Sequence, residues 1–351
     1  MTGHRRELDN MNALACLLVI LIHVLSLGIS TADRASVQAA VIYFPWRLAA
    51  FVVPMFLYTG AVKLARQFAE GPVTPRVYRD YVLRRIRKIY LPYVCAVAVY
   101  YLCFLPIGYV RGSVREFLTY LAVGNLSSPF YYIVIVMQFY LLMPLWVWTV
   151  RHVPFQLGMG LSLLVTFCMQ QFGPLLSLFS VEFRYSDRVF ATYLFFWAWG
   201  LYVGRYYDRI EALLPRRRWQ KALCAAVIVL CAGLAYLQYR GVPVPFAMND
   251  VKLVADALSI LLVHALCTDL LRAPERVQGF FARVARSSFP VYLSHCLFLT
   301  LATAFAQGHG VQKLSVLLPL RALVCYTVPF FLDAAYRRVR AALAEQKSAG
   351  T

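Results

Sequence analysis

The sequence predicts an all-α membrane protein: a bundle of about ten transmembrane helices with both termini in the cytoplasm. Hydrophobic residues make up 61% of the 351 residues, and charged residues only 15%. The apolar residues gather in runs whose length is close to the roughly 20 residues that a helix needs to cross a bilayer. The runs are continuous, whereas strands of a membrane β-barrel alternate apolar and polar residues.

The apolar runs follow one another along the whole chain, with polar loops between them. In chain order they are 11–29, 45–65, 91–110, 129–149, 156–172, 190–204, 220–237, 251–271, 285–305 and 315–333. The first is too long for a signal-peptide core and has no small-residue cleavage site after it, so we expect it to remain as a span. The loops leave no room for a soluble domain, so we expect a single membrane domain over residues 1–351, with a short basic cytoplasmic tail at 336–351.

The net charge of +19 follows the predicted topology. When the loops are assigned to alternate sides, roughly 25 of the 35 lysines and arginines fall on the side of both termini and roughly 10, Arg321 among them, on the other. The positive-inside rule then places both termini in the cytoplasm, and we expect no nucleic acid binding. The nine cysteines lie in or beside apolar runs without a C-x-x-C pair, so we expect packed thiols and no metal centre.

The segment 14–28 of the first run, "LACLLVILIHVLSLG", contains one ionisable side chain, His23. Asp9 and Asn12 precede it, and at about 100° per residue Asn12 and His23 share one helix face. An ionisable group inside a span is a functional hypothesis by default. The alternative is a histidine whose hydrogen bonds are satisfied by a neighbouring helix.

A basic segment, "RDYVLRRIRKIYLPY", precedes the third run and contains Arg84, Arg85, Arg87 and Lys88. A positive-inside anchor accounts for several of these charges. The planar fork of arginine suits phosphate, so a phosphorylated cytoplasmic ligand is the functional alternative.

Two further runs hold polar residues. Gln138 lies in the middle of the run 129–149, near Tyr140, and is either part of a site or an interhelical contact. His295 lies about ten residues into the run 285–305, with Tyr292 beside it. A second histidine inside a span favours function over chance.

In order and spacing, these segments resemble the acyltransferase-3 family, which comprises ten-span bacterial membrane enzymes that acylate surface polysaccharides, lipid-linked sugars and peptidoglycan. "LACLLVILIHV", preceded by Asp9, is similar to the family's first span, and the basic run closing on Pro92 and Tyr93 to its cytoplasmic motif. "QFYLLMPLW" resembles its fourth span and "SSFPVYLSHCLFL" its ninth. The family usually has an arginine where this chain has Asn12, which cannot hold a donor phosphate by charge.

The resemblance implies an O-acyltransferase that moves acetyl or another short acyl group from cytoplasmic acyl-CoA to a hydroxyl of an extracytoplasmic or lipid-linked glycan, in the bacterial cell membrane. Acyl-CoA would be a substrate, with no permanently bound cofactor. The implied roles are donor binding for Arg84, Arg85, Arg87 and Lys88, general base for His23, acceptor orientation or oxyanion stabilisation for His295 and Gln138, and support for Asp9, Asn12, Tyr140 and Tyr292.

Two alternatives stay open at this point. Within the family, a transient acyl-histidine would replace general-base catalysis. In another class, a transporter or flippase for a polysaccharide or lipid-linked sugar also has many spans and buried polar residues. Matching inverted halves would favour the transporter, and the sequence shows none.

Overall fold

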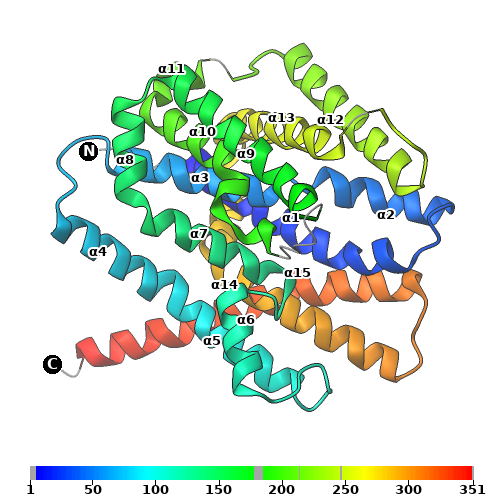
Figure 1. Ribbon diagram of the computed structural model, residues 1–351. Helices are drawn as coiled ribbons and strands as arrows, with labels where there is room; N and C mark the ends of the chain where they lie inside the picture. The colour runs from blue at the N-terminus through cyan, green and yellow to red at the C-terminus, as the bar shows by residue number, and fades with distance from the viewer. Residues whose placement is uncertain (1–4, 178–184, 213, 246, 350–351) are drawn as a thin grey trace. The chain divides into compact units, whose positions relative to one another are not determined.

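The computed structural model describes residues 5–177, 185–212, 214–245 and 247–349, which form helices joined by short loops (Figure 1). No strand occurs within these ranges. The all-α prediction is therefore confirmed. The predicted tail at 336–351 continues the last helix as far as it is described.

Fifteen α-helices and five shorter helical turns make up the described chain. The α-helices are α1 (Arg6–Thr31), α2 (Val37–Leu48), α3 (Val52–Gln67), α4 (Pro75–Arg85), α5 (Leu91–Phe104), α6 (Val114–Val123), α7 (Tyr131–Leu141), α8 (Met143–His152), α9 (Phe155–Ser177), α10 (Leu194–Arg205), α11 (Tyr207–Glu211), α12 (Arg218–Tyr239), α13 (Met248–Asp269), α14 (Glu275–Gly308) and α15 (Leu314–Ala349). The shorter ones are the π-helical turn η1 (Ile86–Tyr90) and the 3₁₀ turns η2 (Ser128–Phe130), η3 (Ser186–Arg188), η4 (Phe190–Tyr193) and η5 (Leu270–Arg272).

Seven helical stretches of the described chain are long and apolar enough to cross a membrane, or eight if the bent pair of α6 and α7, with 56° between its halves, is one broken span. The seven are Arg6–Thr31, Val37–Gln67, Pro75–Phe104, Arg218–Tyr239, Met248–Arg272, Glu275–Gly308 and Leu314–Gln346. Each contains most or all of one predicted run. The count of ten spans and the cytoplasmic termini stay predictions.

The predicted run 129–149 is wrong as a single helix, because α7 ends at Leu141 and α8 begins at Met143. Pro144 lies in the first turn of α8 and has no N–H with which to bond the carbonyl of Tyr140, four residues earlier. Gln138 consequently lies in the last turn of α7 and not in the middle of a span. The predicted run 190–204 is likewise the 3₁₀ turn η4 followed by a helix of only 12 residues.

The chain divides into two compact units. Unit 1 comprises Met1–Arg5, Val53–Ala226 and Ala247–Ala265, and unit 2 comprises Arg6–Val52, Val227–Phe246 and Leu266–Thr351. Each has a hydrophobic core of its own. The histidines His23 and His295 belong to unit 2, whereas the basic segment and Gln138 belong to unit 1.

The core of unit 1 depends on a close approach of α10 to α3. A Cβ atom at Gly200 would lie 2.4 Å from the carbonyl oxygen of Tyr58, and one at Gly204 would lie 2.7 Å from that of Val62. Glycines four residues apart therefore let the two backbones touch, as small residues do between membrane helices. The contact seats Trp197 of α10 on the ring of Phe139, with the ring centroids 4.3 Å apart.

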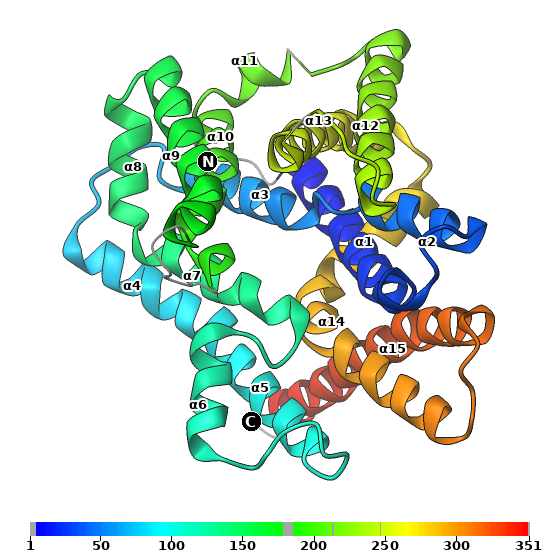
Figure 2. The same ribbon diagram turned by 45° about the vertical axis from the view of Figure 1, so that its right-hand side comes forward.

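The core of unit 2 is built by α1, α14 and α15, which lie side by side (Figure 2, blue, gold and orange to red). Its fully buried residues include Ile20 of α1, Val291 of α14 and Cys325 of α15. The hydroxyl of Tyr326 donates to the carbonyl of Leu17 over 2.7 Å. Unit 2 thus packs two segments 309 residues apart in the sequence against each other.

Pro290 interrupts the hydrogen bonding of α14 one turn before His295, since proline cannot bond the carbonyl of Arg286. Arg337 of α15 supplies the missing donor, with Nη2 at 2.6 Å from that carbonyl oxygen. Its Nε donates to the buried carboxylate of Asp333 over 2.7 Å. The long helix α14 is therefore continuous through its proline because α15 compensates.

The predicted topology can be tested by cysteine labelling. A cysteine at Arg115 should react from outside intact cells with a maleimide that does not cross membranes, and a cysteine at Arg216 should react only after permeabilisation. The parent protein, with its nine native thiols, provides the background. Labelling of both positions from the same side would contradict the alternate assignment of the loops.

Candidate active site

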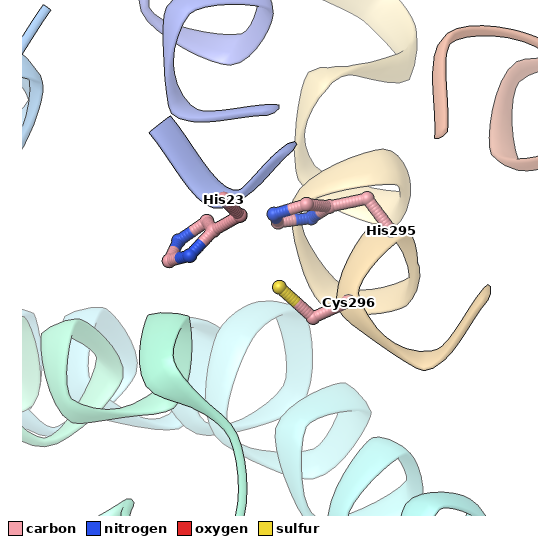
Figure 3. Close-up of side chains that lie close together, drawn as sticks. All are labelled: His23, His295 and Cys296. Carbon is pink, nitrogen blue, oxygen red and sulfur yellow. The ribbon is translucent and has the colours of Figure 1, made fainter. Parts of the chain in front are cut away.

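Unit 2 brings together the two histidines that the sequence singled out. His23 of α1 and His295 of α14 face each other with ring centroids 5.3 Å apart and ring planes inclined by 44° (Figure 3). Cys296 lies beside them, and the nearest nitrogen or sulfur atoms of the three side chains are all within 4.8 Å of one another. We call these three residues the histidine cluster.

The ring of His295 is held in one orientation by its own helix. Its Nδ1 lies 3.0 Å from the carbonyl oxygen of Val291 and 2.9 Å from that of Tyr292. Because carbonyl oxygens only accept hydrogen bonds, Nδ1 carries the proton and Nε2 presents a lone pair. This Nε2 is buried and has no hydrogen-bond partner among the residues that the structure describes. The arrangement leaves a proton acceptor without a partner inside the unit.

His23 is partly buried, and the nitrogens of its imidazole take part in no hydrogen bond with the described residues. The hydrogen bonds to His23 from the described residues go to its carbonyl oxygen, from Ser26 Oγ at 2.7 Å and from Arg321 Nη2 at 2.7 Å, and none goes to its ring. Helix α1 is therefore anchored at the peptide of His23 while both ring nitrogens remain available.

Arg321 of α15 is the anchor, and it is only 4% exposed. Its Nε donates to the carbonyl of Val24 over 3.1 Å, and its Nη1 donates to the hydroxyl of Thr303 over 2.8 Å. No carboxylate among the described residues forms an ion pair with it. The assignment of loops to alternate sides placed Arg321 among the outer charges, so it was not predicted as a site residue. A charged side chain inside the apolar run 315–333 was the signal that could have found it.

The residues predicted to support His23 divide into two sets. Tyr292 is buried beside the cluster, with its ring centroid 6.2 Å from that of His295. Asp9 and Asn12 lie in the first two turns of α1. At about 1.5 Å per residue, Asn12 is some 16 Å from His23 along the helix, so it shares the face without reaching the cluster.

The basic segment of unit 1 separates into one inward and three outward side chains. Arg84, Arg87 and Lys88 are exposed. Arg85 is partly buried, with its guanidinium carbon 4.9 Å from the centroid of Tyr81 and 4.5 Å from that of Tyr140. The π-helical turn η1 follows directly, a feature frequently found at functional sites.

Two buried side chains with hydrogen-bond donors, Tyr81 and Trp197, pack against Tyr140. Among the described residues the indole Nε1 of Trp197 has no hydrogen-bond partner, whereas the hydroxyl of Tyr81 lies next to Arg85. Both rings meet Tyr140 edge-on, with centroids 6.0 Å and 6.1 Å away. Together with Arg85 they form a group of donors, defined here as the Arg85 site. Since a buried unsatisfied donor is costly, this group suits an anionic or carbonyl-bearing ligand.

The amide of Gln138 is already engaged. Its Nε2 donates to the carbonyls of Val134 over 3.2 Å and Arg188 over 2.7 Å, and its Oε1 accepts from the N–H of Phe190 over 3.1 Å. Both amide hydrogens are thus used on backbone atoms. In this structure Gln138 holds the turns η3 and η4 against α7.

A third buried histidine has a packing role. His264 of α13 is 1% exposed, with Nδ1 2.9 Å from the hydroxyl of Tyr58 and Nε2 3.1 Å from that of Tyr207. One hydroxyl donates to the unprotonated nitrogen and the other accepts from the protonated one. His264 therefore joins three segments of unit 1.

The fold and the site define a class of protein: a membrane protein of several apolar helices in which two histidines of different helices face each other. A family model described as "Acyltransferase domain" matches residues 5–334, so the chain belongs to this acyltransferase family and is an acyl-transferring enzyme. The resemblance to the acyltransferase-3 family is confirmed, which favours the enzyme over the transporter.

A relative of the chain comes from Bacillus subtilis (strain 168) and is named "Putative membrane-bound acyltransferase YfiQ". It is 23% identical over 314 residues, which cover 84% of this chain and 81% of that protein. No solved structure matches the chain.

The anchoring role of Arg321 predicts a specific loss of stability. Arg321→Lys keeps the charge but cannot reach both carbonyls of α1 and Thr303 at once. Loss of even one charge-assisted hydrogen bond removes about 1.5–3 kcal/mol, so the thermal unfolding temperature of the purified protein should fall by several degrees. Arg240→Lys, at an exposed position, is the matched control. Equal unfolding temperatures for the two variants would refute the anchor.

Proposed function

We propose that the protein is an O-acyltransferase of the bacterial cell membrane that moves a short acyl group from cytoplasmic acyl-CoA to a hydroxyl of an extracytoplasmic or lipid-linked glycan. The observation that carries the proposal is the histidine cluster, in which two imidazoles present unbonded nitrogens between membrane helices of an acyltransferase. Its partners are the donor, the glycan acceptor and membrane lipid.

His23 acts as general base in this proposal. Transfer to an alcohol requires removal of the hydroxyl proton as the oxygen attacks the acyl carbonyl, and a neutral imidazole, with an ordinary pKa near 6.5, suits that task. Its ring is unbonded while its peptide is fixed by Arg321, so the base is positioned without losing its proton-accepting nitrogen. His295 assists beside it.

The Arg85 site and the exposed side chains around it bind the donor. Acyl-CoA carries several phosphate groups, and Arg84, Arg87 and Lys88 offer exposed positive charge for them. Arg85 is different, because its guanidinium lies over the rings of two tyrosines and is partly buried. We assign it a phosphate or carbonyl of the same donor. Asn12 carries no charge, so it cannot hold a donor phosphate by charge.

The role of His23 predicts the behaviour of His23→Gln. Glutamine has a hydrogen-bond donor and acceptor of similar reach but cannot take up a proton. The variant should accumulate in membranes normally, yet ester-linked acyl groups on envelope glycans, released by mild base and measured by mass spectrometry, should form about 10²–10⁴ times more slowly. If His23→Gln retained more than half of the parent's acylation, His23 would have a packing role and would not be the general base.

The donor site predicts an asymmetry within helix α4. Arg85→Gln should raise the acyl-CoA concentration needed for half-maximal transfer more than about tenfold, the effect of losing one charge-assisted contact. Arg76→Gln removes an exposed charge from the same helix and should change it less than about twofold. Transfer assays on isolated membranes over a range of acetyl-CoA concentrations measure both. If both variants needed the same acetyl-CoA concentration for half-maximal transfer, the basic segment would act only as a topological anchor.

A further inference from the structure

We propose that Cys296 is a nucleophile that carries the acyl group as a thioester between donor and acceptor. This inference rests on the proposed function and deepens it by dividing the transfer into two half-reactions. It concerns the third member of the histidine cluster, which neither general-base catalysis nor the acyl-histidine alternative uses.

The position of Cys296 is the first argument. Its side chain follows His295 on α14 and points toward the space between the two imidazoles (Figure 3). The sulfur and one nitrogen of each histidine lie within 4.8 Å of one another, and the residue is a buried thiol that forms no disulfide. A small relative movement of these side chains brings the thiol within hydrogen-bond reach of a base.

The unbonded Nε2 of His295 is a second and independent argument. This nitrogen belongs to a side chain with no exposed surface, and it has a lone pair but no donor to fill it. The opposite nitrogen is fixed by the carbonyls of Val291 and Tyr292. Nucleophile, base and a group that orients the base are the parts of an activated nucleophile, and all three are present.

The charge of the surroundings favours a thiolate over a metal ion. Two histidines and a cysteine are also a ligand set for zinc. Arg321, however, brings a guanidinium to the carbonyl oxygen of His23 and to the hydroxyl of Thr303, so the cluster has a fixed positive charge next to it. A guanidinium stabilises a thiolate beside it and repels a divalent cation.

In the first half-reaction, the thiol proton of Cys296 passes to Nε2 of His295 as sulfur attacks the acyl-CoA carbonyl. The new Sγ–acyl bond forms, the bond between the acyl carbon and the CoA sulfur breaks, and the proton leaves with CoA as its thiol. One thioester replaces another, so no oxidant or reductant is needed.

In the second half-reaction, His23 takes the proton of the acceptor hydroxyl as its oxygen attacks the acyl-cysteine. The ester bond forms, the Sγ–acyl bond breaks, and the proton returns to Cys296. This scheme gives each histidine one half-reaction. It also lets donor and acceptor arrive at different times, which suits substrates from opposite sides of a membrane.

The first test uses purified full-length protein in lipid nanodiscs with acetyl-CoA and no acceptor. Peptide mass spectrometry should find one acetyl group on Cys296, removable by neutral hydroxylamine as expected for a thioester. Isotope-labelled CoA should exchange into acetyl-CoA, because the first half-reaction runs in both directions without an acceptor.

Single-residue variants identify the side chain that carries the acetyl group. Cys296→Ala and the near-isosteric Cys296→Ser should both lose the thioester adduct, and CoA exchange should fall more than a hundredfold. Cys16→Ala is the control, because it removes a buried thiol of a different helix, α1. In the described hydrogen bonds the sulfur of Cys16 donates only to a backbone carbonyl, so this variant should keep the acetyl adduct and the CoA exchange. His23→Gln should keep the adduct and accumulate it, since only the second half-reaction is blocked.

The failures are distinguishable. Cys296→Ala membranes that still acetylate glycans, an adduct on histidine, stoichiometric zinc in the purified protein, or a parent protein that transfers acetyl without adduct or exchange would each overturn the nucleophile and leave the proposed function standing. A parent protein that neither exchanges CoA nor acetylates envelope glycans would overturn the proposed function itself.

Discussion

The hydrogen bonds of Arg321 are the constraint on which unit 2 depends. A guanidinium buried among apolar helices is costly unless it is hydrogen-bonded, and here α1 and α14 give each of its three nitrogens an acceptor, two carbonyls and one hydroxyl. Two of the acceptors are the carbonyls of His23 and Val24, so satisfying the charge fixes α1 at the residue whose ring faces His295. The same contact that resolves an electrostatic problem therefore builds the reactive cluster.

This arrangement separates structural from chemical tasks within each histidine. The peptide of His23 is held by Arg321, and Nδ1 of His295 is held by its own helix, so neither ring needs its second nitrogen for structure. Pro290 lies about one turn before His295 on α14, and Arg337 of α15 donates to the carbonyl of Arg286, which the proline leaves without its usual N–H donor. At the Arg85 site of unit 1, aromatic rings likewise position a guanidinium.

The sequence was sufficient for what depends on composition and local pattern. It predicted the all-α class, seven of the long apolar helices, and His23 and His295 as candidates, because an ionisable residue in an apolar run stands out. It could not predict that Pro144 splits the run 129–149, or that Gln138 bonds backbone 50 residues away. It also could not reveal the roles of Arg321 and Cys296, since these arise from contacts of α14 and α15 with α1, which is distant from both in sequence.

The central claim is that His23 and His295 serve one reaction, and the double variant tests it most directly. Acyl transfer to envelope glycans should be measured for His23→Gln, His295→Gln and the combination at equal protein levels in the membrane. Residues that act within one catalytic cycle are strongly non-additive, so the double variant should be within about threefold of the more damaged single variant. A double variant whose loss equals the product of the two single losses would contradict the account.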